Sequence, residues 1–156
     1  MIFQIVPMNS SHIPALAELE KMCFSAPWSE SSLREELANP LSHFLAAVAE
    51  EKTAGYLGVQ EVAGEGYITN IAVFPEYRRQ GIAQALLEAA EAGAGERGCA
   101  FLTLEVRASN KAAAALYSKI GYTVTGERKN FYSNPAENAL LMTKQLRKSE
   151  EQNAGI

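Results

Sequence analysis

The segment most restrictive for the fold is residues 70–87, N-I-A-V-F-P-E-Y-R-R-Q-G-I-A-Q-A-L-L, an apolar run, a short polar turn and a second apolar run. This pattern predicts a strand that leads through a glycine-containing turn directly into a helix. A helix start leaves about four backbone N–H groups unpaired and carries partial positive charge. Gly81 and Ala83 keep bulky side chains away, and Arg78 and Arg79 add charge. The turn therefore predicts a site for an anion such as pyrophosphate.

The same residues are also compatible with a plain surface turn, because many strand-to-helix turns contain a glycine and solvated arginines. Two known phosphate motifs are absent from the segment. It contains neither the Gly-x-Gly-x-x-Gly pattern of dinucleotide sites nor the Gly-Lys-Ser/Thr ending of the P-loop. From these residues alone, the ligand stays open.

The length of 156 residues favours one domain, which we place at residues 1–146. Residues 147–156 lose apolar periodicity and are expected to form a flexible tail. A formal charge of −4 argues against a general nucleic-acid partner. The two cysteines suggest neither a metal site nor a disulfide framework. The amino-terminal residues lack a basic, cleavable leader and no long apolar run follows, so we expect a cytoplasmic protein without a membrane partner.

Apolar periodicity and turn residues predict the remaining elements. The first helix is expected to begin at a Ser10 or Ser11 cap and to carry Glu18, Glu20 and Lys21 on its polar face. Ser29 is the expected cap of the second helix. The order predicts the α/β (α+β) class, with a mixed sheet of about six or seven strands and about four helices. The expected strands are residues 2–6, 44–49, 54–62, 67–74, 100–106, 122–131 and 139–146, with helices after Gln80 and at 111–119.

Glu105 is a charged residue near the end of an apolar strand, where a carboxylate is costly unless exposed, paired or functional. It could accept a proton from an amine, directly or through a water. Alternation along the strand equally allows a solvent-facing position or an ion pair with Arg107.

Two residues of the following helix are also candidates. The hydroxyl of Tyr117 could protonate a departing thiolate, but its spacing from Ala113 also fits an aromatic core residue. Asn110 is either a plain helix cap or a cap that also contacts a cofactor.

The pattern Arg78-x-x-Gly81-x-Ala83 resembles the signature of the GNAT superfamily of N-acetyltransferases. Further segments are similar to the family of alanine N-acetyltransferases that modify the amino terminus of a small-subunit ribosomal protein. These segments are Pro27–Ser29, Leu104–Asn110, Ala115–Tyr117 with Gly121–Tyr122, and Arg128–Ser133 with Leu140–Met142. The similarity covers nearly the whole chain in order.

The resemblance implies acetyl-CoA as cosubstrate, no metal, and the amino terminus of a protein or peptide, in particular of a ribosomal protein, as acceptor. It implies Glu105 as proton acceptor and Tyr117 as proton donor, with Trp28, Glu105 and Tyr132 around the acceptor. The implied cofactor contacts are Ile71, Ala72, Val73, Arg79, Gln80, Gly81, Ile82, Ala83, Gln84 and Asn110. One position departs from the pattern, because Asn138 stands where relatives usually carry an acidic residue.

Three readings follow. The first is acetylation of an N-terminal alanine, whose α-amine has a pKa of about 7.7–8.0 and is easier to deprotonate than lysine at about 10.4. The second is acetylation of lysine or of a small-molecule amine, which the same cofactor site permits. The third is a non-catalytic module that senses acyl-CoA, for which Glu105 and Tyr117 would be dispensable.

Overall fold

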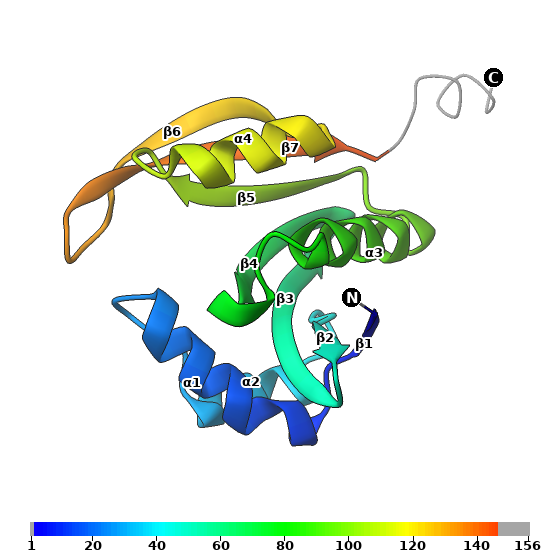
Figure 1. The fold of residues 1–156 in the computed structure, drawn as a ribbon. Helices are drawn as coiled ribbons and strands as arrows, with labels where there is room; N and C mark the ends of the chain where they lie inside the picture. The colour runs from blue at the N-terminus through cyan, green and yellow to red at the C-terminus, as the bar shows by residue number, and fades with distance from the viewer. Residues whose placement is uncertain (1, 147–156) are drawn as a thin grey trace, which may run out of the picture.

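The structure, a computed structural model, describes residues 2–146, so the predicted tail at 147–156 lies outside the described residues. One seven-stranded mixed sheet has the order β1-β2-β3-β4-β5-β7-β6, and four α-helices flank it (Figure 1). The predicted fold class is confirmed. The strands are β1 (Phe3–Pro7), β2 (Leu45–Ala49), β3 (Lys52–Val62), β4 (Glu65–Val73), β5 (Phe101–Arg107), β6 (Thr123–Tyr132) and β7 (Glu137–Gln145). The helices are α1 (Ile13–Cys23), α2 (Glu30–Ala38), α3 (Ile82–Glu96) and α4 (Lys111–Ile120), with short 3-10 turns η1 (Ser10–His12) and η2 (Pro75–Tyr77).

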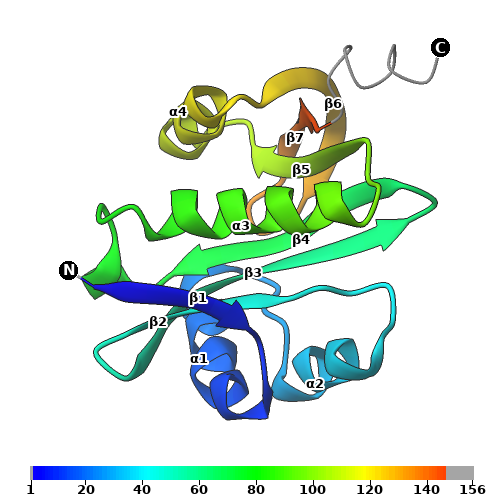
Figure 2. The same cartoon turned by 90° about the vertical axis from the view of Figure 1, so that its right-hand side faces the viewer.

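Strands β1 to β4 form an antiparallel meander, and α3 then crosses over so that β5 lies parallel to β4. The final hairpin places β7 between β5 and β6. Helices α3 and α4 lie on one face of the sheet, and α1 and α2 lie on the other (Figure 2). A cluster of buried side chains is packed under each pair of helices. The sheet is therefore the middle of three layers.

Strands β4 and β5 separate along their length. They pair only over the three positions from Glu65–Phe101 to Tyr67–Thr103, although β4 continues to Val73 and β5 to Arg107. The separation begins where β4 has a bulge, since Gly58 of β3 pairs with Asn70 and Val59 with Ile68. Such a bulge bends a strand and increases its twist. The inner edges of β4 and β5 beyond this point face each other without a shared ladder.

Two predicted helix caps are confirmed. The Ser29 hydroxyl caps α2 by accepting from Ser32 N–H, and Asn110 caps α4 by accepting from Ala113 N–H. The Ser10 or Ser11 cap is wrong. Asn9 accepts from Ser11 N–H and caps a 3-10 turn, after which α1 begins without a side-chain cap. A short amide side chain makes this contact as readily as a hydroxyl.

The sequence also placed Glu20 wrongly, on the polar face of α1. Its side chain is buried, with 1% exposure, beside Leu16 and Leu19. The buried face of α1 is therefore wider than the face formed by its apolar residues alone. Within residues 2–146, no helix is both long and apolar enough to cross a membrane.

Candidate functional site

The turn before α3 has the shape of an anion site. Arg79 and Gly81 both adopt left-handed backbone conformations, with φ of 63° and 84°, and α3 begins without a side-chain cap. A Cβ built on Gly81 would meet no atom within 4 Å, so the space beside this backbone is open. Alternating left-handed residues and uncapped helical N–H groups form concavities that bind phosphate. The predicted residues 79–84 thus meet at one helix start.

The two arginines of the turn differ in their contacts. The Arg78 guanidinium is engaged within the protein, where its Nε donates to the Val73 carbonyl at 2.9 Å and its Nη2 to Cys23 Sγ at 3.4 Å. Arg78 thus fastens the end of β4, while its positive charge stays close to the turn. Within residues 2–146, Arg79 makes no such hydrogen bond or ion pair, and its side chain is exposed.

Ile71, Ala72 and Val73 form the last three positions of β4, directly before this turn. They pair with β3 on one side, but their other edge lies in the region where β4 and β5 have separated. Unpaired backbone groups at such an edge can bind an extended chain carrying amide groups. The chain leads from this edge through the 3-10 turn η2 to the predicted anion site at residues 79–84.

Glu105 lies on β5 at the opposite side of this separation. Its side chain is 28% exposed, and its Oε1 lies 3.6 Å from Arg128 Nε on β6. An ion pair does form, but with Arg128, so the expectation of Arg107 as its partner is wrong. Arg107 instead donates to the Pro135 carbonyl at 2.9 Å and pairs with Glu137 at 3.3 Å. One side of Glu105 thus remains accessible to a ligand.

Tyr132 connects the two predicted catalytic residues. It lies within electrostatic range of both Glu105 and Tyr117, and the Arg107 guanidinium covers its ring at 4.4 Å from the centroid. Burial and the nearby Glu105 carboxylate raise the pKa of Tyr132. Burial, with a contribution from Tyr132, raises the pKa of Tyr117 to about 12. Tyr117 is thus a protonated hydroxyl at neutral pH. Its ring packs in the core, as one alternative expected, and its role as proton donor stays a prediction.

Trp28, the predicted acceptor contact, lies outside the strands. It belongs to the segment between α1 and α2, and its ring packs on Phe44 with centroids 6.0 Å apart. The same segment contacts the turn between β6 and β7, where Ser25 Oγ donates to the Ser133 carbonyl at 3.3 Å. Two segments separated by 108 residues are thereby joined beside Tyr132.

Asn110 and Asn138 both make structural contacts. Asn110 Oδ1 is occupied by the cap of α4, which leaves only its amide nitrogen for a ligand. Asn138 accepts from Asn130 N–H at 2.9 Å and donates to Glu127 Oε2 at 2.7 Å. A carboxylate at position 138 could make the first of these bonds but not the second.

The sequence reasoning missed Arg128, Glu137 and Glu20. Glu137 accepts from Ser109 N–H at 2.6 Å, and this bond, together with Arg107, lowers the pKa of its carboxyl. Arg128 lies within a segment that the family resemblance covers, but nothing local marks it as the partner of Glu105. Glu20 follows Leu16 by four residues, a spacing that could have indicated its buried position.

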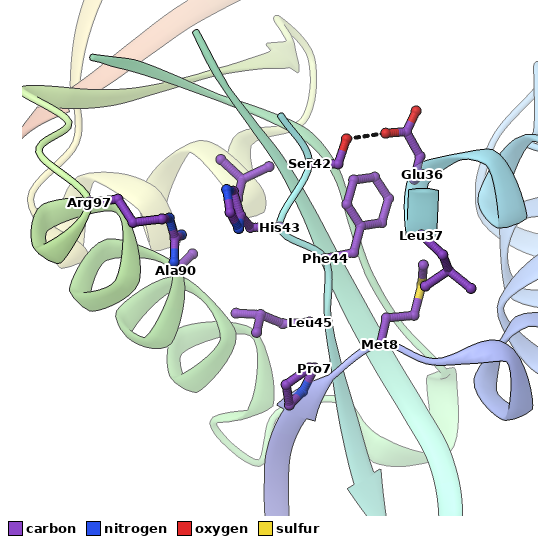
Figure 3. Close-up of a pocket in the computed structure, with 11 residues that line it drawn as sticks. Pro7, Met8, Glu36, Leu37, Ser42, His43, Phe44, Leu45, Ala90 and Arg97 are labelled. Carbon is purple, nitrogen blue, oxygen red and sulfur yellow. Dashed lines mark hydrogen bonds between the residues drawn. The ribbon is translucent and has the colours of Figure 1, made fainter. Parts of the chain in front are cut away.

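A separate cavity of about 300 Å³ lies at the start of β2 (Figure 3). Side chains from β1, α2, β2 and α3 line it, and none is a predicted site residue. Its polar groups are already paired, since Ser42 donates to Glu36 and Arg97 binds Glu61. Residues 2–146 contain no group of three or more His, Cys, Asp or Glu side chains arranged for a metal ion.

Comparison with known proteins places these features in context. The sequence model of the acetyltransferase (GNAT) family matches residues 13–122. The ribosomal protein bS18-alanine N-acetyltransferase of Escherichia coli (strain K12) is 36% identical over 140 residues, which cover 88% of this chain and 94% of that protein. A Bacillus subtilis (strain 168) protein with a provisional name of the same kind is 39% identical over 136 residues, 86% of this chain and 90% of that protein.

Solved structures give the same correspondence. The crystal structure of the ribosomal-protein-S18-alanine N-acetyltransferase from Escherichia coli superposes with a TM-score of 0.85 at 33% identity, covering 94% of this chain and 96% of that one. Ard1 from Thermoplasma volcanium superposes with a TM-score of 0.86 at 20% identity, covering 95% of this chain and all of that one, which shows a shared fold.

Proposed function

The chain belongs to the GNAT family of acetyltransferases, and we propose that it transfers the acetyl group of acetyl-CoA to the α-amine of an N-terminal alanine of a small-subunit ribosomal protein. The relatives from Escherichia coli named for this activity are similar over nearly their whole length, which supports the acceptor. An acceptor that belongs to the ribosome places the activity in the cytoplasm.

Acetyl-CoA is the cosubstrate, and when bound it supplies a thioester whose carbonyl carbon is open to attack by an amine. The residues present fit it. The open backbone around Gly81 and the uncapped start of α3 suit the pyrophosphate, with Arg79 adding charge. The unpaired edge at Ile71, Ala72 and Val73 suits the amide-containing arm, and the amide nitrogen of Asn110 is free to donate to it.

Glu105 is the proton acceptor in this proposal. Its carboxylate lies on β5 at the open edge of the separation from β4, accessible on the side away from Arg128. Proton removal from an attacking amine by a positioned base contributes about 10²–10⁴ in rate. Because an α-amine has a pKa of about 7.7–8.0, a carboxylate that accepts its proton directly or through a water is sufficient near neutral pH.

Tyr117 is the proton donor to the departing sulfur. Its buried hydroxyl, with a pKa of about 12, stays protonated throughout the neutral range. Tyr132 lies within electrostatic range of both Tyr117 and Glu105, which supports the proposal that proton donor and proton acceptor act on the same bound substrates. The hydroxyl stabilises negative charge as it develops on sulfur and supplies the proton that completes the free thiol.

The observation that carries the choice of an amino terminus as acceptor is the contact between the segment before α2 and the β6–β7 turn. Ser25 Oγ donates to the Ser133 carbonyl, which joins the segment before α2 to the β6–β7 turn and would narrow the approach of an acceptor to Glu105. An extended chain end fits such an approach better than a lysine projecting from a folded surface. The lower pKa of the α-amine favours the same choice.

A mixture of peptides with different first residues, incubated with acetyl-CoA and the protein, tests the proposal by mass spectrometry. Acetylation of the α-amine of alanine-starting peptides is expected. A lysine-containing peptide with a blocked amino terminus is the matched control, and its acetylation with no alanine product would replace the proposal by lysine acetylation. Binding of CoA without any product would favour the sensing module.

A further inference from the structure

Glu20 carries a buried charge that the reaction does not use. It lies in the last turn of α1 with 1% exposure, and both carboxylate oxygens accept hydrogen bonds. Oε1 accepts from the Trp28 N–H at 2.9 Å, and Oε2 accepts from the Tyr56 hydroxyl at 2.6 Å. A buried carboxylate is tolerated only with such partners, so its geometry is closely fixed.

These two bonds connect Trp28 through Glu20 to β3, the strand that pairs with β4. Trp28 belongs to the segment 24–29 between α1 and α2, which we call the acceptor loop. Tyr56 lies on β3, paired in register with Ala72 of β4, one of the proposed cofactor contacts. Asn70 of β4 lies near the Tyr56 hydroxyl, and the side-chain Oδ1 of Asn70 is buried without a hydrogen-bond partner among the described residues. Glu20 thus sets the position of the acceptor loop relative to β4.

The other bonds of the acceptor loop hold it less firmly. Phe24 N–H donates to the Glu20 carbonyl and only ends α1, while the Ser25 bond to Ser133 is exposed at 3.3 Å. Within the described part of the chain, the Trp28 N–H donates only to Glu20, and the Trp28 ring is partly buried against the cluster under α1 and α2. The bond to Glu20 is the charge-assisted one, which is the stronger type.

We propose that Glu20 is a positioning residue for acceptor binding. Its carboxylate holds Trp28 and the acceptor loop against the sheet, so that its removal weakens binding of the acceptor peptide and leaves binding of acetyl-CoA unchanged. The proposal rests on the proposed function for the identity of the acceptor. The proposed contacts of Gly81 and of residues 71–73 with acetyl-CoA do not involve the acceptor loop. We therefore expect the KM for the acceptor to change without the KM for acetyl-CoA.

The test compares Glu20→Leu with the double variant Glu20→Leu, Tyr56→Phe. Leucine removes both acceptor oxygens with little change in volume, but it leaves the Tyr56 hydroxyl buried and unpaired, so the single variant loses stability. The double variant removes that hydroxyl too and should regain most of the stability. Glu18→Gln, an exposed position of the same helix paired only with Lys21, is the matched control.

For both Glu20 variants, the KM for an alanine-starting peptide should rise about tenfold, the effect of losing one charge-assisted hydrogen bond, while the KM for acetyl-CoA stays unchanged. A purely structural role predicts instead that the peptide KM returns to the wild-type value when stability returns in the double variant. That result, or a parallel rise in both Michaelis constants, would overturn the proposal.

Trp28 is the single tryptophan of the chain, so its fluorescence reports the acceptor loop without any need for catalysis. Both Glu20 variants should shift its emission to longer wavelength and increase quenching by acrylamide, and Glu18→Gln should change neither. An unchanged emission in the double variant would also overturn the proposal. If the wild-type protein acetylated no alanine-starting peptide, the proposed function would fail, but this emission would still decide whether Glu20 holds the loop.

Discussion

Glu105 on β5 faces Arg128 on β6, with 3.6 Å between Oε1 and Nε, although β7 lies between the two strands in the sheet. The pair crosses over β7 on the surface where the acceptor is proposed to bind. Arg128 is 56% exposed and is therefore a weak partner, worth about 0–1 kcal/mol. The Glu105 carboxylate is therefore held in place by an exposed ion pair and not by a buried one.

Glu105→Gln should lower kcat by about 10²–10⁴, the contribution of a general base, with the dissociation constant of CoA unchanged. Steady-state kinetics and calorimetric titration with CoA measure the two quantities. Glu127→Gln is the control, because Glu127 lies on β6 and contacts only the Asn138 amide. Full activity in the Glu105 variant would show that Glu105 is not the proton acceptor.

Tyr117→Phe should lower kcat by about 10²-fold if its hydroxyl donates the proton. Because burial raises the pKa of Tyr117 to about 12, its donor form is complete below that pH and is lost only above it. The wild-type kcat should therefore show no decline between pH 8 and pH 10 that depends on Tyr117, which a pH profile of both proteins checks.

Tyr122→Phe is the matched control for Tyr117. The two rings pack edge to face at 6.2 Å, but the Tyr122 hydroxyl donates to Glu91 at 3.0 Å and not to the proposed site. Its loss should cost about 1 kcal/mol of unfolding free energy and leave kcat nearly unchanged. An equal fall in kcat for both variants would assign Tyr117 to packing alone.

Gly81→Val should raise the KM for acetyl-CoA equally for every acceptor. The left-handed backbone at φ 84° costs a valine about 1–2 kcal/mol, and its side chain would occupy the open space beside the helix start. Gly95→Ala on the same helix meets no atom within 4 Å and should instead stabilise the protein by about 0.5–1 kcal/mol. A change in acceptor preference for Gly81→Val would contradict the division between cofactor and acceptor residues.

Glu61 should contribute stability that is lost in acid. Burial favours its neutral form, but the hydrogen bonds and charge of Arg97 outweigh this effect and lower its pKa. A carboxyl whose pKa is lower in the folded state stabilises above its unfolded value and loses this contribution as pH falls through the folded value.

Glu61→Gln should therefore reduce the unfolding free energy by about 1–2 kcal/mol at pH 7, with the difference from wild type shrinking as pH falls below about 4. Urea unfolding at several pH values measures this. Glu30→Gln, whose exposed partner Arg34 lies at 3.4 Å, is the control and should show almost no pH-dependent difference. A difference at position 61 that stayed constant in acid would contradict the assignment.

The sequence by itself determined the elements and the local chemistry. The strand–turn–helix around Gly81, the caps at Ser29 and Asn110 and the alternation that exposes Glu105 all follow from spacings within one or two turns. Local patterns suffice there because hydrogen bonds and side-chain periods repeat over a few residues. The family resemblance then linked these segments to one reaction.

Only the tertiary structure decided which residues meet. Because β7 lies between β5 and β6, Arg128 pairs with Glu105 and Arg107 pairs with Glu137. Proximity in the sequence had instead suggested an ion pair between Glu105 and Arg107. Burial of Glu20 depends on Trp28 and Tyr56, which lie 8 and 36 residues away. A buried charge is stable only where distant partners converge on it, and no local pattern encodes that convergence.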